Sequence, residues 1–158
     1  MKTCDEELSS GARGFASITS YLMADHARLD RLLAGLRSSI ASGAIFEAVA
    51  LHEKLERGLR RHIRLEETIV FPLFEERTRI GGPVAVMKVE HRQIEALLER
   101  TRAALAEAGR ARLTEAAGEL ATLIAQHNLK EERILYPKTD QALTPDERRE
   151  LAARLERS

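Results

Sequence analysis

The chain has little cysteine, and it has neither an export signal nor a long apolar run. Cys4 is the only cysteine in 158 residues, so no internal disulfide can form and a reducing compartment is expected. The N-terminal residues do not show a basic segment followed by an apolar one, so the sequence predicts a cytoplasmic protein. Because no run of 18 apolar residues occurs, we predict no membrane-spanning helix and no membrane partner.

An excess of charge of one sign is also absent. The 25 basic and 25 acidic residues give a formal net charge of zero. A nucleic-acid-binding protein normally carries a basic stripe, and none is visible along the sequence. We therefore expect no nucleic-acid partner, and the sequence predicts no particular oligomeric state.

Helix-breaking residues are scarce, with nine glycines and four prolines. Between them lie four long stretches with apolar residues three and four positions apart, a spacing that predicts amphipathic helices. Thr144-Pro145-Asp146-Glu147 is typical of a helix start and predicts a short fifth helix. The predicted fold is all-α, an up-down-up-down four-helix bundle with a short C-terminal fifth helix. The predicted ranges are a flexible tail over 1–15, a domain over 16–158, and long helices over 17–41, 45–79, 83–108 and 111–141.

Two segments of the chain repeat at an offset of 65 residues. HIRLEETIVFP at 62–72 aligns with HNLKEERILYP at 127–137, and DHARLDRLL at 25–33 aligns with EHRQIEALL at 90–98. The repeat therefore corresponds to a helix hairpin used twice. Neither hairpin can bury its apolar face alone, so we expect the two to pack together around a pseudo-two-fold axis.

Each half carries a lone histidine and, 36 residues later, an H-x-x-x-E motif. Residues four apart lie on one face of a helix, and His62 lies on the apolar stripe of its helix. Burying a carboxylate costs several kcal/mol unless it is paired or coordinated, so a cation is expected between the halves. The six candidate ligands are His26, His62, Glu66, His91, His127 and Glu131.

Simpler interpretations exist for each motif taken alone. A lone histidine on an apolar helix face is usually a core residue, and an isolated H-x-x-x-E is often a surface pair. The shared register of all six residues favours metal binding. His52 is predicted to lie on a solvated flank, because Ala117 occupies its matched position. Glu67 and Glu132 are likewise expected to be solvated.

Other polar residues lie near the predicted ligands. Asp30 and Glu95 each follow a candidate ligand by four residues, so each could be an extra ligand or orient an imidazole. Tyr21 and Tyr136 could approach the site, although aromatic residues at core spacing usually only pack.

The ligand types indicate which metal is expected. Imidazoles with bridging carboxylates favour a pair of iron or manganese ions, whereas structural zinc would normally recruit cysteine. Two imidazoles for each ion, with both carboxylates spanning the pair, leave room for a bridging oxo or hydroxo group and one open position. Dioxygen, peroxide or nitric oxide could bind there. Ferritin-like di-iron bundles use E-x-x-H, in which a glutamate lies three residues before the histidine. In this chain the residues three positions before the histidines are Met23, Val49, Leu59, Lys88 and Ile124. None of them is acidic, so a ferritin-like site is excluded.

Together these motifs resemble those of the hemerythrin-like proteins, which contain the His-His-Glu cation-binding domain. The resemblance extends from about Tyr21 to Pro137 and includes Phe71-Pro72 and Tyr136-Pro137. It implies a non-haem di-iron centre with two iron ions, bridged by Glu66 and Glu131. The implied ligands are His26, His62, Glu66, His91, His127 and Glu131.

The sequence departs from two branches of that family. Oxygen-carrying hemerythrins have a second histidine in the third helix, where this chain has Glu95. Their fourth-helix carboxylate is an aspartate, whereas this chain has Glu131 at the closer i+4 spacing from His127. Relatives linked to the repair of iron centres carry an additional N-terminal domain with cysteine, and only a short tail with Cys4 precedes the first predicted helix. Both differences weigh against oxygen carriage and repair.

Three functions are therefore expected. The leading one is a di-iron protein that binds a small ligand (dioxygen, peroxide or nitric oxide) in sensing or in oxidative or nitrosative stress defence. The second is a di-iron enzyme that decomposes peroxide or repairs iron centres, for which Glu90, Glu95 and Tyr21 are the candidate proton donors. The third is a metal-free helical interaction module.

Overall fold

The computed structural model describes residues 14–107 and 109–158, and every regular element among them is a helix. The helices begin and end within two residues of the predicted limits, but two turns of π-helix, η1 and η2, interrupt the second and fourth predicted helices. The elements are α1 Ile18–Ser42, α2 Ile45–Leu65, η1 Glu66–Val70, α3 Phe71–Thr78, α4 Gly82–Ala106, α5 Arg110–Lys130, η2 Glu131–Leu135, α6 Tyr136–Gln141 and α7 Pro145–Arg157.

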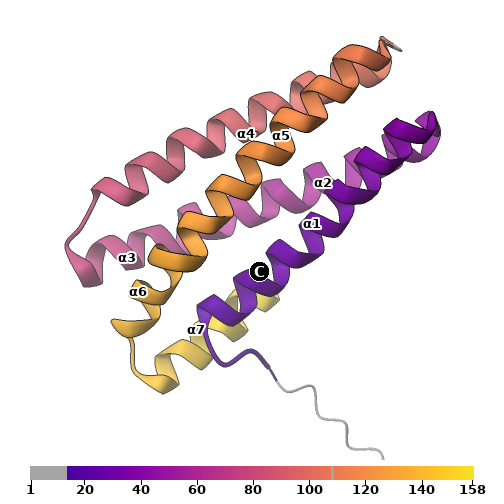
Figure 1. The fold of residues 1–158 in the computed structure, drawn as a ribbon. Coiled ribbons are helices and arrows are strands. Elements are labelled where there is room, and N and C mark those ends of the chain that lie inside the picture. The colour runs from indigo at the N-terminus through magenta and orange to yellow at the C-terminus, as the bar shows by residue number, and fades with distance from the viewer. Residues whose placement is uncertain (1–13, 108) are drawn as a thin grey trace, which may run out of the picture.

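The four long helices lie side by side as a helical bundle (Figure 1). The hairpin partners α1 and α2 pack along each other, as do α4 and α5, and the two hairpins meet where α1 contacts α5 and α2 contacts α4. Helix α7 packs against α1. No helix of the described residues has the length and apolar composition needed to cross a membrane.

Capping residues define where several of the helices begin and end. Gly43 adopts a left-handed conformation with φ of 79° and ends α1, as glycine can without strain. The carboxylate of Asp140 accepts hydrogen bonds from the backbone N–H groups of Ile18 and Thr19, which ties α6 to the start of α1. Thr144 forms a capping box with Glu147 and starts α7, as the sequence predicted.

The buried apolar residues form two clusters, and the predicted ligands lie between them. In α1, Leu22 belongs to one cluster and Leu29 to the other, with His26 between them. In α4, Met87 and Ile94 flank His91 in the same way. Apolar layers above and below therefore shield the polar layer from water.

Each π-helical turn begins at a predicted ligand carboxylate. The N–H of Phe71 bonds to the carbonyl of Glu66, five residues earlier, and Tyr136 bonds to Glu131 in the same way. A proline follows each turn, at 72 and 137, where the ring removes a donor and disfavours regular α-helix. The extra residue in each turn rotates the following helix and brings the fully buried rings of Phe71 and Tyr136 beside the predicted ligands.

The predicted flexible tail over 1–15 lies outside the described residues except for Gly14 and Phe15. Phe15 is half-buried, and its ring meets the ring of Tyr21 edge-on with centroids 5.2 Å apart. The packed part of the chain therefore includes Phe15.

Candidate metal centre

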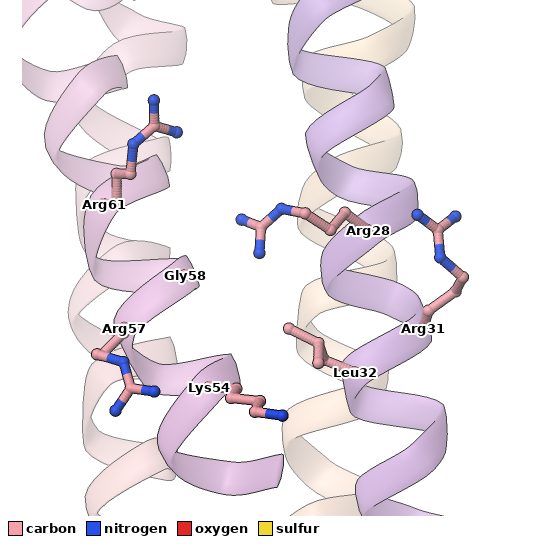
Figure 2. Close-up of a pocket in the computed structure, with 7 residues that line it drawn as sticks. All are labelled: Arg28, Arg31, Leu32, Lys54, Arg57, Gly58 and Arg61. Atoms are coloured by element: carbon pink, nitrogen blue, oxygen red, sulfur yellow. The ribbon is translucent and has the colours of Figure 1, made fainter. Parts of the chain in front are cut away.

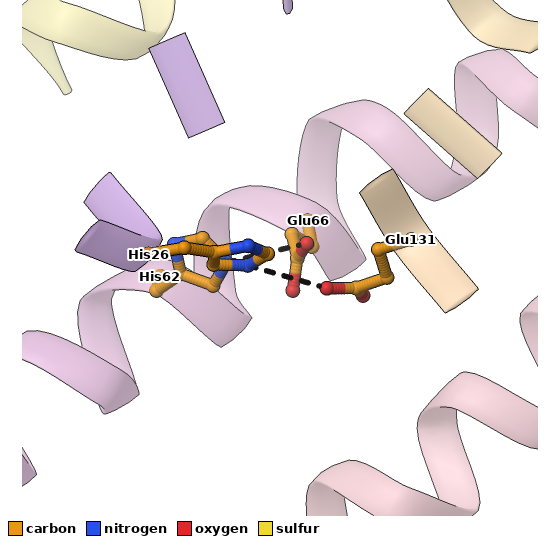
Figure 3. A group of neighbouring side chains, drawn as sticks. All are labelled: His26, His62, Glu66 and Glu131. Carbon is orange, nitrogen blue, oxygen red and sulfur yellow. Dashed lines mark hydrogen bonds and ion pairs between the residues drawn. The ribbon is translucent and has the colours of Figure 1, made fainter. Parts of the chain in front are cut away.

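The structure brings the six predicted ligand residues together in the buried layer. They form two groups that share both carboxylates, and within each group one nitrogen or oxygen atom from every residue lies within 4.8 Å of the others. Figure 3 shows the first group, with the imidazoles of His26 and His62 pointing toward the two carboxylates. The first group is His26, His62, Glu66 and Glu131, and the second is Glu66, His91, His127 and Glu131.

Each carboxylate presents one oxygen to each group. Glu66 Oε1 lies 3.4 Å from His62 Nε2, and its Oε2 lies 3.2 Å from His91 Nε2. Glu131 Oε2 lies 3.4 Å from His26 Nε2, and its Oε1 lies 3.0 Å from His127 Nε2. Both side chains are completely buried. This arrangement suits carboxylates that bridge two cations.

The outer ring nitrogens of all four histidines contact carboxylates. Within each hairpin, Asp25 lies 2.8 Å from His62 Nδ1 and Glu90 lies 2.9 Å from His127 Nδ1. A carboxylate only accepts hydrogen bonds, so each Nδ1 must carry a proton, and an imidazole in its neutral form then presents the lone pair of Nε2 to the centre.

The other two outer carboxylates come from the opposite hairpin. Glu132 lies 2.7 Å from His26 Nδ1, and Glu67 lies 2.8 Å from His91 Nδ1. The prediction that Glu67 and Glu132 are solvated was therefore wrong. Their side chains are 35% and 28% exposed, and the π-helical turns that contain them direct their carboxylates toward the imidazoles.

The inner nitrogens lie close together in pairs. His26 Nε2 and His62 Nε2 are 3.0 Å apart, and His91 Nε2 and His127 Nε2 are 3.1 Å apart. Two lone pairs at this distance repel unless a proton or a metal ion lies between them. An ion that binds two imidazole nitrogens at about 2.1 Å and at a right angle holds them about 3.0 Å apart.

Among the residues that the structure describes, two buried side-chain oxygens lack a hydrogen-bond donor. They are Glu66 Oε2 and Glu131 Oε1, and both face the histidines of the second group. Buried carboxylate oxygens without a partner are costly, and imidazole nitrogen with carboxylate oxygen is a donor set that first-row transition metals accept. The residues present therefore fit a pair of metal ions.

The pKa values of the buried histidines and of Glu66 also show that the cluster favours positive charge beside its carboxylates. Burial alone would lower the pKa of His62, but the charge of Glu66 and the hydrogen bond to Asp25 outweigh burial and raise that pKa to about 10. Burial would also lower the pKa of His127, but the hydrogen bond and the charge of Glu131 outweigh burial and raise that pKa to about 9. Burial would raise the pKa of Glu66, but His62 and His91 hold it well below its usual value. Protons on the imidazoles and metal ions thus compete for the same positions.

The two groups differ at one aromatic residue. The hydroxyl of Tyr136 donates to Glu66 Oε1, and it lies 2.9 Å from Glu131 Oε2 and 3.1 Å from His26 Nε2. The matched residue of the first half is Phe71, whose ring stacks on His91 without a polar atom. Burial, together with Glu131 and Glu66, raises the pKa of the Tyr136 hydroxyl well above its usual value. The sequence allowed that Tyr136 could approach the site but favoured a packing role, although its place in the repeated motif, four positions after Glu132, was a usable signal.

The four remaining predicted residues lie around the two groups. Glu90 contacts His127 and the ammonium of Lys130, which is a position from which it can orient an imidazole. Asp30 is exposed, but its carboxyl group is partly desolvated, and this partial burial is the largest cause that raises its pKa. Glu95 is half-exposed and pairs with Arg60 at 3.5 Å. Tyr21 is buried, and its hydroxyl accepts from Arg61. The six converging residues include neither Asp30 nor Glu95.

His52 is buried, and its prediction as a solvated residue was wrong. Only 1% of its surface is exposed, and its Nε2 lies 2.9 Å from the carbonyl oxygen of Leu98. Helix α2 packs against both α1 and α4, so its buried face is wider than one apolar stripe. Ala117 is also buried, which shows that this position lies in the core of both halves.

A comparison with known protein families agrees with this geometry. The model for the hemerythrin HHE cation binding domain matches residues 17–139. The chain belongs to this hemerythrin family. The match covers all six converging residues and both π-helical turns, so the family assignment and the metal-compatible cluster concern the same part of the chain. Neither the curated proteins nor the solved structures gave a significant match.

Proposed function

We propose that this hemerythrin-family chain is a non-haem di-iron protein of the cytoplasm with an up-down-up-down bundle. The proposed ligands hold two iron ions with a bridging oxo or hydroxo group, and a small ligand such as dioxygen, peroxide or nitric oxide binds there. Sensing or defence against oxidative or nitrosative stress is the proposed role. The ligands are His26, His62, Glu66, His91, His127 and Glu131.

The observation that carries the proposal is the orientation of the four imidazoles. Each histidine donates a hydrogen bond from its Nδ1–H to a carboxylate, so each Nε2 is a ligand atom aimed at an oxygen of Glu66 or Glu131. Metal-binding histidines almost always have such an outer partner. In a core that only retained polar residues, there would be no energetic gain from directing four Nε2 lone pairs toward one centre.

The iron pair would supply the redox chemistry and an exchangeable position for the small ligand. The chain's own residues do the rest. Asp25, Glu67, Glu90 and Glu132 fix the imidazole tautomers and add negative charge that favours cations. The two apolar clusters exclude water, and the Tyr136 hydroxyl lies where it can donate a hydrogen bond.

Metal analysis of the purified protein, combined with its visible spectrum, tests the proposal. We expect about two irons per chain, because two histidines for each ion and two shared carboxylates suit a pair of ions. We also expect an absorption band that changes on exposure to air, peroxide or nitric oxide. His62→Ala and Glu131→Ala should each lower metal content and abolish the band.

His52→Ala is the matched control, because it removes a buried histidine that contacts the Leu98 carbonyl instead of the centre. The other half already has alanine at this position, so the fold should tolerate the change and keep its iron. A wild-type protein that takes up one zinc ion, or no metal, and shows no band would contradict the di-iron proposal.

The Tyr136 hydroxyl favours a second candidate, a di-iron enzyme that decomposes peroxide. Such chemistry needs a positioned proton donor, and the raised pKa of Tyr136 keeps its proton on the oxygen at neutral pH. Tyr136→Phe should then slow peroxide consumption by the iron-loaded protein while iron content stays unchanged. Equal rates for the two proteins would leave ligand binding as the better assignment.

A further inference from the structure

A basic groove lies between α1 and α2, on the surface of the first hairpin. It has a volume of about 720 Å³, and no acidic residue lines it. Figure 2 shows Arg28 and Lys54 extending from the two helices into the space between them. The five cations that line the groove are Arg28, Arg31, Lys54, Arg57 and Arg61.

Most of these cations have no carboxylate partner. Among the residues that the structure describes, Arg28 alone of the five forms an ion pair, with Asp25 at 2.8 Å. Arg61 bonds instead to the Tyr21 hydroxyl and the Leu155 carbonyl, which hold its guanidinium in place. Elsewhere on the bundle, arginines such as Arg60 and Arg100 are paired with glutamates. Like charges that crowd without partners are unfavourable, so an anion would relieve the groove.

Gly58 shapes the floor of the groove. A Cβ atom at this position would lie 2.6 Å from Leu29 Cδ2 and 3.2 Å from a guanidinium nitrogen of Arg28. Any larger residue would therefore displace Leu29 and crowd the guanidinium of Arg28. The glycine allows a cation to approach the helix backbone at the centre of the groove.

The second half of the chain provides an internal control. At the offset of 65, the five cations correspond to Gln93, Ala96, Glu119, Thr122 and Gln126, and Gly58 corresponds to Leu123. None of these residues is basic, although the proposed metal ligands match in both halves. The fold and the metal centre therefore do not require the basic residues.

We propose that this groove binds a small molecule that carries two or more phosphate groups. Its volume is in the range of small-ligand sites, about 300–1,000 Å³, and arginine and lysine are the side chains that bind phosphate. The five cations lie in one groove of a chain with zero formal charge, which favours a compact anion over a long polymer. None of the residues that line the groove is a proposed metal ligand, and the proposal does not rest on the presence of iron.

Calorimetric titration of the purified protein with sodium tripolyphosphate, with ATP and with inorganic phosphate tests the proposal. We expect saturable binding of tripolyphosphate and ATP at one site, and weaker binding of phosphate. The exposed pair Lys54→Gln and Arg57→Gln, combined in one variant, should weaken tripolyphosphate binding by at least about 10-fold. Arg112→Gln combined with Lys138→Gln removes the same charge on α5 and α6 and should change the affinity by less than about 2-fold.

Three results would overturn the proposal: no saturable binding, equal loss in both double variants, or tighter binding of a 20-nucleotide single strand than of tripolyphosphate. Binding to vesicles that contain a phosphorylated inositol lipid, without binding of the free headgroup, would also overturn it. Because tripolyphosphate also binds iron, iron content is measured before and after each titration. Both variants keep the proposed metal ligands, so loss of iron affects them equally, and a failure of the groove leaves the di-iron proposal standing.

Discussion

The two hairpins of this bundle carry matching polar residues at their buried centre and different residues in the layers around it. His26, His62 and Glu66 of the first hairpin are matched by His91, His127 and Glu131 of the second. The outer carboxylates match as well, Asp25 with Glu90 and Glu67 with Glu132. The aromatic ring beside the centre differs, as do the charges of the outer groove. Residues that hold the proposed ions are thus constrained by symmetry, whereas residues that would give the ions or the surface a specific activity are not.

The largest effect is expected where the hairpins agree. Asp25→Ala and Glu90→Ala each remove the acceptor that holds one imidazole, and loss of such a partner typically lowers metal affinity 10–100-fold. Competition with a coloured chelator measures the affinity. The two variants should lose affinity to a similar extent. A loss confined to one of them would show that only one hairpin holds a metal ion.

An intermediate effect is expected where the aromatic rings differ. Tyr136→Phe removes the donor to two buried carboxylates, so the metal-free protein should lose about 1.5 kcal/mol of unfolding free energy. The metal-loaded protein should lose less, because the ions neutralise the same oxygens. Urea unfolding with and without a chelator measures both values. Tyr21→Phe is the control, since its hydroxyl bonds to Arg61 outside the centre, and its effect should not depend on metal.

The smallest effect is expected at the outer grooves. Lys54→Gln should change the unfolding free energy by less than about 0.5 kcal/mol, as exposed substitutions away from special features do. The counterpart change, Glu119→Gln, breaks a surface ion pair with Arg100 and should cost about 0.2–1 kcal/mol. Both values come from urea unfolding of the chain in one metal state. A loss above about 1 kcal/mol for Lys54→Gln would indicate that the groove's cations support the fold.

The sequence predicted the helices and the convergence of six residues because both follow from periodicity and from an exact internal repeat. It missed the π-helical turns, since a hydrophobic pattern does not show one extra residue in a helix. The misplacement of Glu67 and Glu132 followed from that omission, as their directions were taken from a regular helix. For Tyr136 the sequence favoured packing over contact with the site, because its ring is at an ordinary core position and only its hydroxyl reaches the centre.

The basic groove illustrates a different limit. Its cations are separated along the chain by glutamates and apolar residues, so no basic stripe is visible in the sequence. Packing of α1 against α2 gathers Arg28, Lys54 and Arg57 on one surface. The clustering of cations in the groove therefore depends on the tertiary fold, whereas the spacing of residues along the sequence alone predicts the ligand pattern.

Asp25 contacts both the groove and the proposed metal centre. One of its oxygens accepts from Arg28 and the other from His62 Nδ1. An anion that draws Arg28 away leaves Asp25 more negative and makes His62 a stronger electron donor. Thermodynamic reciprocity then requires that occupancy of the metal centre alter the affinity for the anion by the same factor. In the second hairpin Glu90 is shared with Lys130 instead, so this coupling would belong to one half of the molecule.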